Sequence, residues 1–223
     1  MKPVASKPKR PHASRGLLAE IKGNSWSVWL VFGACLLPEV YFLGADGGLW
    51  GSPRARYLAI DFFAFWAGLL GNWLPNYWAQ PYLMFLTYGF LHAGLAHFAV
   101  NMLTLFSLGV PVAAEVGAAR FLLLYALLLV AGACGFALFP EVQAPMVGAS
   151  GALFGLAGVV LAWEMQNRRS LGKSPRPVLR SLAILVGLNA VLWWAMNGQL
   201  AWQTHLGGFL AGWAAAYVLR PRV

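Results

Sequence analysis

Charged residues are scarce in this sequence. Only 10% of the 223 residues are charged, whereas 60% are hydrophobic. A soluble domain carries about 25% charged residues, so the composition excludes an ordinary soluble protein and predicts a membrane protein. Acidic residues are the rarest, with 7 Asp and Glu against 16 Lys and Arg. The basic residues lie in short clusters beside apolar runs, where membrane proteins keep their anchors, so we predict no nucleic-acid partner.

Cysteines and grouped metal ligands are scarce as well. The two cysteines, Cys35 and Cys134, both fall inside apolar segments. We interpret them as free, packed thiols rather than as a disulfide or a redox pair. The four histidines have no carboxylates or cysteines grouped with them along the sequence. We therefore expect no metal and no organic cofactor.

The N-terminal segment is basic and has no apolar stretch of the kind that a cleavable signal peptide needs. We interpret residues 1–23 as a disordered cytoplasmic tail that contacts anionic lipid, with binding of a partner protein as the alternative. The apolar remainder, residues 24–219, is predicted to form one membrane domain. Residues 220–223 are then a short cytoplasmic C-terminus.

Six apolar segments are long enough to cross a bilayer, which takes about 20 residues of helix. We predict an all-α, polytopic bundle of six transmembrane helices at 25–44, 82–108, 120–139, 148–166, 180–197 and 202–219. The segment 45–81 is rich in aromatic residues but is interrupted by polar residues, Gly and Pro. We interpret it as an interfacial, partly helical lobe. A seventh span there is the alternative and would place the two chain ends on opposite sides.

The basic residues also predict the orientation of the chain. With six spans and a cytoplasmic N-terminus, every Lys and Arg except Arg54 and Arg56 falls on the cytoplasmic side. Such asymmetry is typical of multi-pass proteins and supports cytoplasmic positions for both termini. We expect the host membrane to be a bacterial inner membrane.

Polar residues inside the predicted spans gather at one depth. In this orientation the second, fourth and sixth spans all start from the outer side. They carry His92, His97 and Asn101, then Ser150, then His205 in their outer halves. Polar side chains inside a membrane are costly, so a group of them predicts a functional site.

Glycines indicate which spans touch. Gly151 and Gly155 form one ridge of small residues on the fourth span, and Gly208 and Gly212 form another on the sixth. Such ridges let two helix backbones approach closely. If the two ridges face each other, the residues just ahead of them are brought together.

Those residues are Ser150 and His205, which then come within hydrogen-bond reach. A serine hydroxyl becomes a good nucleophile when a base takes its proton, and histidine is the usual base. Phe154 lies one turn after Ser150 and would pack on the imidazole ring. Each residue also has a structural interpretation: helix packing for the Gly-x-Ser-Gly string, and hydrogen bonds to neighbouring helices for the histidines and Asn101.

Three segments, HAGLAHFAVNM, GASGALFG and HLGGFLAG, resemble the rhomboid family of intramembrane serine proteases. The resemblance covers roughly residues 50–219, and the segment EVGAARFLLLY is similar to the second loop of the family through Glu115 and Gly117. The motif positions that match are His92, His97, Asn101, Gly148, Ser150, Gly151, His205, Gly208 and Gly212.

The resemblance implies a six-helix core in which Ser150 attacks a peptide bond of a transmembrane protein substrate. His205 would act as general base and then as general acid. Asn101 and the Ser150 backbone N–H would form the oxyanion hole, with His97 as a further donor. His92 is implied to support the first loop rather than the chemistry.

The sequence departs from the family at two places. Many members have a Trp-Arg pair where residues 82–84 read Tyr-Leu-Met, and bacterial members often have Tyr where Phe154 stands. A catalytically silent rhomboid-like protein that binds membrane clients is the alternative function. A transporter or channel would call for acidic residues within the spans, and these are rare. The HExxH motif of zinc proteases and the GxGD-type aspartate pair are both missing from the sequence.

Overall fold

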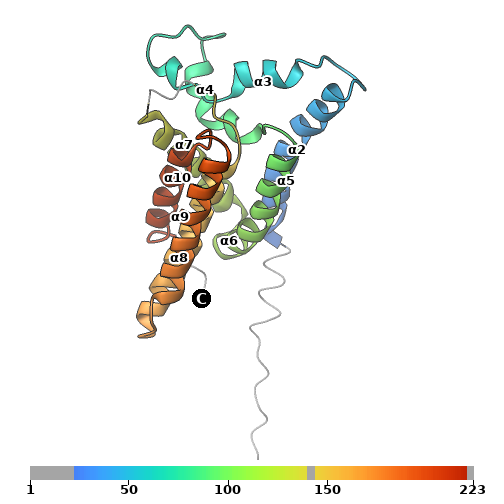
Figure 1. The fold of residues 1–223 in the computed structure, drawn as a ribbon. Helices are drawn as coiled ribbons and strands as arrows, with labels where there is room; N and C mark the ends of the chain where they lie inside the picture. The colour runs from blue at the N-terminus through green and yellow to red at the C-terminus, as the bar shows by residue number, and fades with distance from the viewer. Residues whose placement is uncertain (1–22, 140–143, 220–223) are drawn as a thin grey trace, which may run out of the picture.

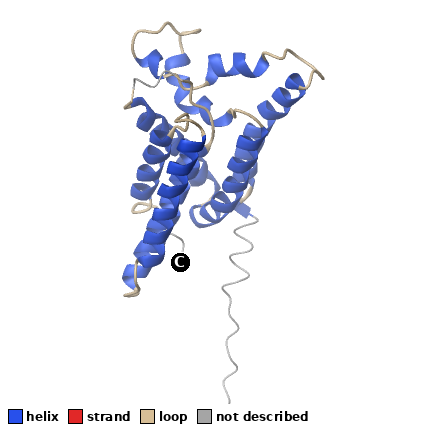
Figure 2. Cartoon of the chain, in the orientation of Figure 1, coloured by secondary structure: helices blue, strands red, loops and turns tan. Residues whose placement is uncertain are grey.

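The computed structural model describes residues 23–139 and 144–219. The predicted N-terminal tail, apart from Gly23, and the predicted C-terminus lie outside the described residues. Regular structure in the described part is helical throughout, and strand-like pairing there is limited to an isolated bridge between Phe65 and Met146 (Figure 2). The all-α prediction is confirmed.

Four helices in the described residues are long and apolar enough to cross a membrane. They are α2 (Trp26–Asp46), the continuous helix Leu95–Val116, α7 (Ala118–Ala137) and α9 (Arg176–Ala195). The other two predicted spans correspond to α8 (Ser150–Ser170) and α10 (Trp202–Ala215). Helix α8 ends in a polar and charged turn, and α10 has only 14 residues. The count of six spans therefore remains a prediction.

The second predicted span is not one helix, and its expected start at residue 82 is wrong. Helix α4 (Gln80–Thr87) and the short 3-10 helix η2 (Tyr88–Phe90) end before an irregular turn. Gly94 in that turn has a φ of 152°, a conformation open to glycine and strained for other residues. The long helix then begins at Leu95 and runs through α5 (Leu95–Thr104), a π-helical turn η3 (Leu105–Gly109) and α6 (Val110–Val116).

The lobe between the first two spans is partly helical, as predicted. It contains α3 (Ala55–Phe63) and the 3-10 helix η1 (Ala67–Leu70), and α3 lies across the end of the bundle instead of along it (Figure 1). The Gln80 side chain donates a 2.7 Å hydrogen bond to the Asp61 carbonyl, and the Thr87 hydroxyl donates one of 2.7 Å to the Phe63 carbonyl. These bonds attach the C-terminal end of α3 to α4.

Helices α7, α8 and α10 form the closely packed centre of the bundle, and glycines set their spacing. A Cβ on Gly208 would overlap the backbone carbonyl of Gly151, and one on Gly212 would overlap that of Gly155. The two glycine ridges therefore face each other in backbone contact. Gly208 and Gly212 have no room for any side chain, because the atoms they would meet are backbone. At Gly151 and Gly155 a Cβ would instead meet the side chains of Thr204 and Leu128.

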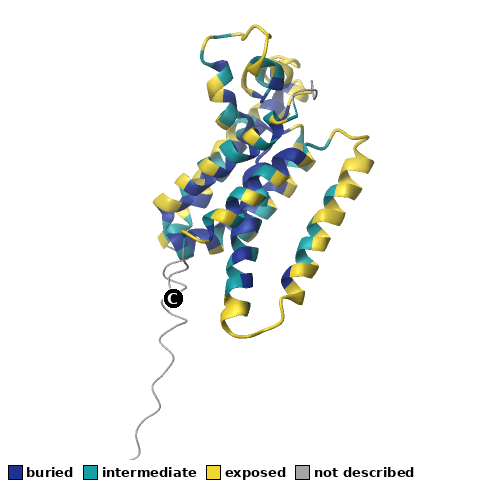
Figure 3. Cartoon of the chain, turned by 90° about the vertical axis from the view of Figure 1, so that its left-hand side faces the viewer, coloured by how far each residue is buried: buried dark blue, intermediate teal, exposed yellow. Residues whose placement is uncertain are grey.

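Helix α9 stands apart from this centre. Only 6% of its most apolar stretch is buried, and Val178 is the residue of α9 that the core covers. Figure 3 shows α9 as a mostly exposed helix beside the blue core. An exposed helix that is apolar all round is suited to lipid rather than water.

Both cysteines are free, but they differ in burial. Cys35 on α2 is fully buried, whereas Cys134 on α7 is exposed. The prediction that both thiols are packed is therefore wrong for Cys134. The buried face of α7 in this region passes through Gly132, Ala133 and Phe136, so Cys134 points away from the core.

Candidate active site

The site forms where α8 and α10 begin. Ser150 is the first residue of α8, and His205 lies in the first turn of α10. The imidazole Nε2 of His205 lies 2.9 Å from the Ser150 hydroxyl oxygen, Oγ. The backbone contact of Gly208 with Gly151 sets this separation, because it fixes the two helix starts side by side. A serine and a histidine at this distance can exchange a proton.

Two further residues hold the imidazole of His205. The Phe154 ring stacks on it, with ring centroids 4.1 Å apart and planes 6° from parallel. The other ring nitrogen, Nδ1, lies 2.6 Å from the amide oxygen of Asn189 on α9. Sequence reasoning missed Asn189. Its signal was a single amide side chain within the apolar run AILVGLNAVLWW.

Asn101 and His97 come from α5 and lie beside the approach to Ser150. A Cβ on Gly148 would lie 2.8 Å from His97 Nε2 and 3.5 Å from Asn101 Nδ2. Gly148 has a φ of 121°, so only glycine fits here both in conformation and in space. The structure thus brings His97 and Asn101 next to Gly148, two residues before Ser150.

Asn101 and His97 of α5 can each donate a hydrogen bond to a group bound beside Ser150. Asn101 is buried, and within the described part of the chain its amide nitrogen has no hydrogen-bond partner. The Ala93 backbone N–H donates to His97 Nδ1 at 3.4 Å, which leaves the proton of a neutral His97 ring on Nε2. A buried donor without a partner is costly. The Asn101 amide is therefore suited to binding an oxygen atom, and the Nε2–H of the partly buried His97 lies next to it.

His92 lies in the turn before α5 and is buried. Its ring packs edge-on against the His97 ring, with centroids 5.2 Å apart. Burial lowers the pKa of His92 to about 3, with His97 and Arg56 acting in the same direction. The ring is therefore neutral at physiological pH and contributes packing rather than charge.

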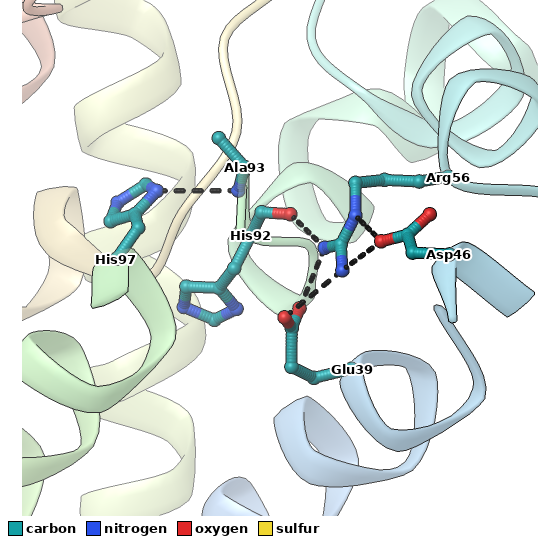
Figure 4. Close-up of polar contacts among 6 residues, drawn as sticks. All are labelled: Glu39, Asp46, Arg56, His92, Ala93 and His97. Atoms are coloured by element: carbon teal, nitrogen blue, oxygen red, sulfur yellow. Dashed lines mark hydrogen bonds and ion pairs between the residues drawn. The ribbon is translucent and has the colours of Figure 1, made fainter. Parts of the chain in front are cut away.

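An ion-pair cluster anchors this turn, and sequence reasoning missed it (Figure 4). Arg56 of α3 donates from Nη1 to Glu39 at 2.9 Å and to the His92 carbonyl at 2.8 Å. Its Nε and Nη2 both donate to Asp46, at 3.0 and 2.9 Å. Burial lowers the pKa of Arg56, but the two carboxylates outweigh it and raise the pKa overall. Arg56 thereby ties α3, α2 and the turn before α5 together.

Two features of the sequence in this region were unusual: the charge of Arg56 on the outer side, and Tyr-Leu-Met at residues 82–84. Arg56 departs from the charge asymmetry because its charge is neutralised and buried rather than placed in water. Met84, one of the residues where many rhomboids have a Trp-Arg pair, is fully buried in the apolar core. Arg56 joins the lobe to α2 and to the turn before α5.

We expect Arg56→Met to lower the free energy of unfolding by about 3–5 kcal/mol, because Glu39 would keep a buried charge without a partner. The Glu39 side chain is 1% exposed. Thermal unfolding in detergent measures the loss. The neighbouring, exposed Arg54 is the matched control, and Arg54→Met should leave the Tm unchanged. The double variant Arg56→Met with Glu39→Met should recover most of the loss; if it does not, the buried charge is not its cause.

A cavity of about 270 Å³ lies beside His205. Its lining residues are Phe154, Leu182, Leu185, Val186, Asn189, Trp202, His205, Leu206 and Phe209. The lining is apolar apart from the amide and the imidazole. Among the described residues, no group of three or more His, Cys, Asp and Glu side chains is placed to hold a metal ion.

The sequence of the site region matches a known family. Residues 76–222 match the rhomboid domain. The chain belongs to the rhomboid family. This confirms the resemblance seen in the sequence, and a rhomboid with these apolar helices is a multi-pass membrane protein. The match contains the Ser150, His205, Asn101 and His97 positions, whereas Arg56 and its carboxylate partners, Glu39 and Asp46, precede it.

Several curated rhomboids are similar to this chain. It is 36% identical over 130 residues to "Rhomboid protease GluP" of Bacillus subtilis (strain 168), covering 58% of this chain and 24% of that protein. It is 32% identical over 132 residues to "RHOMBOID-like protein 6, mitochondrial" of Arabidopsis thaliana, covering 58% and 41%. It is 30% identical over 128 residues to "Putative rhomboid protease YdcA" of Bacillus subtilis (strain 168), covering 57% and 62%. The chain thus spans less than two thirds of the length of these relatives.

Proposed function

We propose that this rhomboid is an intramembrane serine endopeptidase that cleaves single-span membrane proteins within or beside their transmembrane segment. The observation that carries the proposal is the 2.9 Å contact of Ser150 Oγ with His205 Nε2 at the start of two helices in backbone contact. The relatives named as rhomboid proteases support it.

The geometry supports acyl transfer in two steps. His205 Nε2 takes the hydroxyl proton of Ser150 while Oγ attacks the carbonyl carbon of the scissile peptide bond. His205 then gives that proton to the leaving amine, and an acyl-enzyme remains on Ser150. Water attacks the ester with His205 again as the base, which releases the new carboxyl end and restores the hydroxyl.

When Ser150 attacks, the carbonyl oxygen of the scissile peptide bond becomes negatively charged. Hydrogen-bond donors beside Ser150 can stabilise this charge. We assign the Ser150 backbone N–H, which at the first position of α8 has no partner within that helix, and Asn101 Nδ2 to this oxyanion hole, with His97 Nε2 as a further donor. The N-terminal end of α8 adds the favourable helix dipole. Preorganised donors of this kind stabilise the transition state most where water is excluded.

Among the residues that the structure describes, no carboxylate is hydrogen-bonded to His205, and this fits the apolar surroundings. A carboxylate in the apolar cavity would carry a large desolvation cost. Stacking on Phe154 orients the imidazole without placing an anion there.

The proposed topology has six spans, with both termini in the cytoplasm of a bacterial cell. Helices α8 and α10 complete the count, because the apolar part of α8 and the polar residues Gln203, Thr204 and His205 of α10 are buried inside the bundle. The proposed site then lies toward the outer side of the membrane.

Asn101→Ala is expected to lower kcat by about 10²–10³ while leaving KM nearly unchanged, since the lost donor acts on the transition state. Steady-state cleavage of one substrate by both proteins measures this. The exposed α5 residue Val100 offers a matched control, and Val100→Ala should keep the wild-type rate. Equal kcat values for Asn101→Ala and wild type would remove Asn101 from the oxyanion hole.

The proposed function is tested with purified wild type and Ser150→Ala in liposomes that contain a single-span model substrate. Mass spectrometry of the products maps the cut. We expect wild type to cut within or beside the membrane segment and Ser150→Ala to leave the substrate intact. Cleavage by both proteins, or stable binding of the substrate by both without cleavage, would contradict the proposal.

A further inference from the structure

We propose that Asn189 is a positioning residue for His205, so that the site is a Ser–His–Asn arrangement rather than a bare dyad. This inference rests on the proposed protease function and adds a third element, α9, to the site. The amide oxygen of Asn189 lies 2.6 Å from His205 Nδ1, and Ser150 Oγ lies 2.9 Å from Nε2.

The two contacts fix which ring nitrogen carries the proton. Nε2 must accept the Ser150 hydroxyl proton, so in the resting site the imidazole proton sits on Nδ1. An Nδ1–H group in an apolar cavity needs an acceptor, because a buried donor without one is costly. The Asn189 oxygen is that acceptor, and it selects the tautomer in which His205 is a base toward Ser150.

The orientation of the Asn189 amide is fixed from its other end. Its nitrogen, Nδ2, donates a 3.0 Å hydrogen bond to the Leu185 backbone carbonyl, one turn earlier on α9. Rotating the amide by half a turn would place Nδ2 against the Nδ1–H of His205 and the amide oxygen against the Leu185 carbonyl. Both contacts would be repulsive. The observed orientation is therefore the one that both neighbours require.

A neutral amide is suited to this place. The cavity next to it is lined by apolar side chains, including Leu182, Val186 and Phe209, and α9 is apolar and exposed over most of its length. A carboxylate would bind the imidazolium more strongly but would be costly to bury here. Loss of the aspartate in a soluble serine protease costs about 3 × 10⁴ in kcat. Loss of a neutral acceptor should lower kcat less than loss of a carboxylate does, and we expect a decrease of about 10–100-fold.

The test compares Asn189→Leu, which is close in size but has no acceptor, with Asn189→Asp, which keeps an acceptor oxygen. Three quantities are measured: the rate of Ser150 labelling by a fluorophosphonate, kcat, and KM for the model substrate. We expect Asn189→Leu to lower the labelling rate and kcat together by about 10–100-fold at unchanged KM. Asn189→Asp keeps an acceptor toward Nδ1 but loses the hydrogen bond to the Leu185 carbonyl and buries a carboxylate. Both of its rates should therefore lie between those of Asn189→Leu and the wild type.

Leu192 lies on α9 outside the cavity lining and supplies the matched control. Leu192→Ala should label and cleave at the wild-type rate, and Asn189→Leu should still unfold cooperatively in detergent, so that its lower rates are not those of an unfolded protein. If Asn189→Leu labels as fast as wild type, Asn189 does not position the imidazole. A folded Asn189→Asp protein that labels no faster than Asn189→Leu would also overturn the proposal.

A second readout separates this inference from the proposed function. The ¹⁵N resonances of the His205 ring, assigned by their loss in His205→Ala, report the tautomer without any substrate. We expect a ring protonated on Nδ1 in the wild type and a change toward mixed tautomers in Asn189→Leu. If the wild type neither cleaves nor labels, the proposed function fails, while this spectrum still decides whether Asn189 holds the ring. The same spectrum in both proteins would overturn the inference.

Discussion

Ser150→Ala and His205→Ala should each lower kcat by about 10⁶, and the double variant should lose no more than either single one. The reason is that the two side chains act as one unit. The hydroxyl is a poor nucleophile without the base, and the base has no proton to take without the hydroxyl. Their 2.9 Å contact makes this coupling direct.

A double-mutant cycle on one substrate measures the coupling. Residual activity in all three variants should be equal and should come from substrate binding and the oxyanion donors alone. The control is Leu192→Ala, which should combine additively with either substitution. Additive losses in the Ser150 and His205 double variant would mean that the two residues act independently, and the proposed mechanism would then be wrong.

Gly208→Leu should abolish activity by separating α10 from α8. A side chain at this position would overlap the Gly151 carbonyl, which is backbone and cannot rotate away. Overpacking a core typically costs about 1–3 kcal/mol and more when the neighbours cannot adjust. Here the displacement also moves His205 away from Ser150, so the rate should fall even in a variant that still folds.

Two measurements check this prediction, namely the Tm in detergent and the rate of labelling by a fluorophosphonate. Gly187 of α9 is the matched control, since a Cβ there would meet nothing within 4 Å. Gly187→Leu should retain the wild-type Tm and labelling rate. A Gly208→Leu protein with wild-type Tm and labelling rate would show that backbone contact of the two helices does not set the site.

The features that the sequence predicted are those with short, periodic patterns. The helical class follows from long apolar runs. The glycine ridges are visible because their spacing of four places them on one helix face. Once those ridges meet, the contact of Ser150 with His205 follows from their positions at the starts of α8 and α10. Helix periodicity and close packing are enough to bring these residues together.

The features that escaped sequence reasoning depend on contacts between distant segments. Asn189 is one polar residue in an apolar helix, and only the packing of α9 beside α10 shows what it faces. The partners of Arg56 lie on α2 and in the turn before α5, and no local pattern links them. The break before α5 was hidden because the segment stays apolar through the irregular turn, and hydropathy does not distinguish a helix from a buried turn.

The central claim is that Ser150 is a nucleophile activated by His205. The most direct measurement treats the membrane-embedded protein with a fluorophosphonate and locates the adduct by peptide mass spectrometry. The account predicts a single adduct on Ser150 that is lost in His205→Ala, while that variant keeps the wild-type Tm. A folded wild-type protein that carries no adduct on Ser150 would contradict the account and favour a rhomboid that binds membrane clients without cutting them.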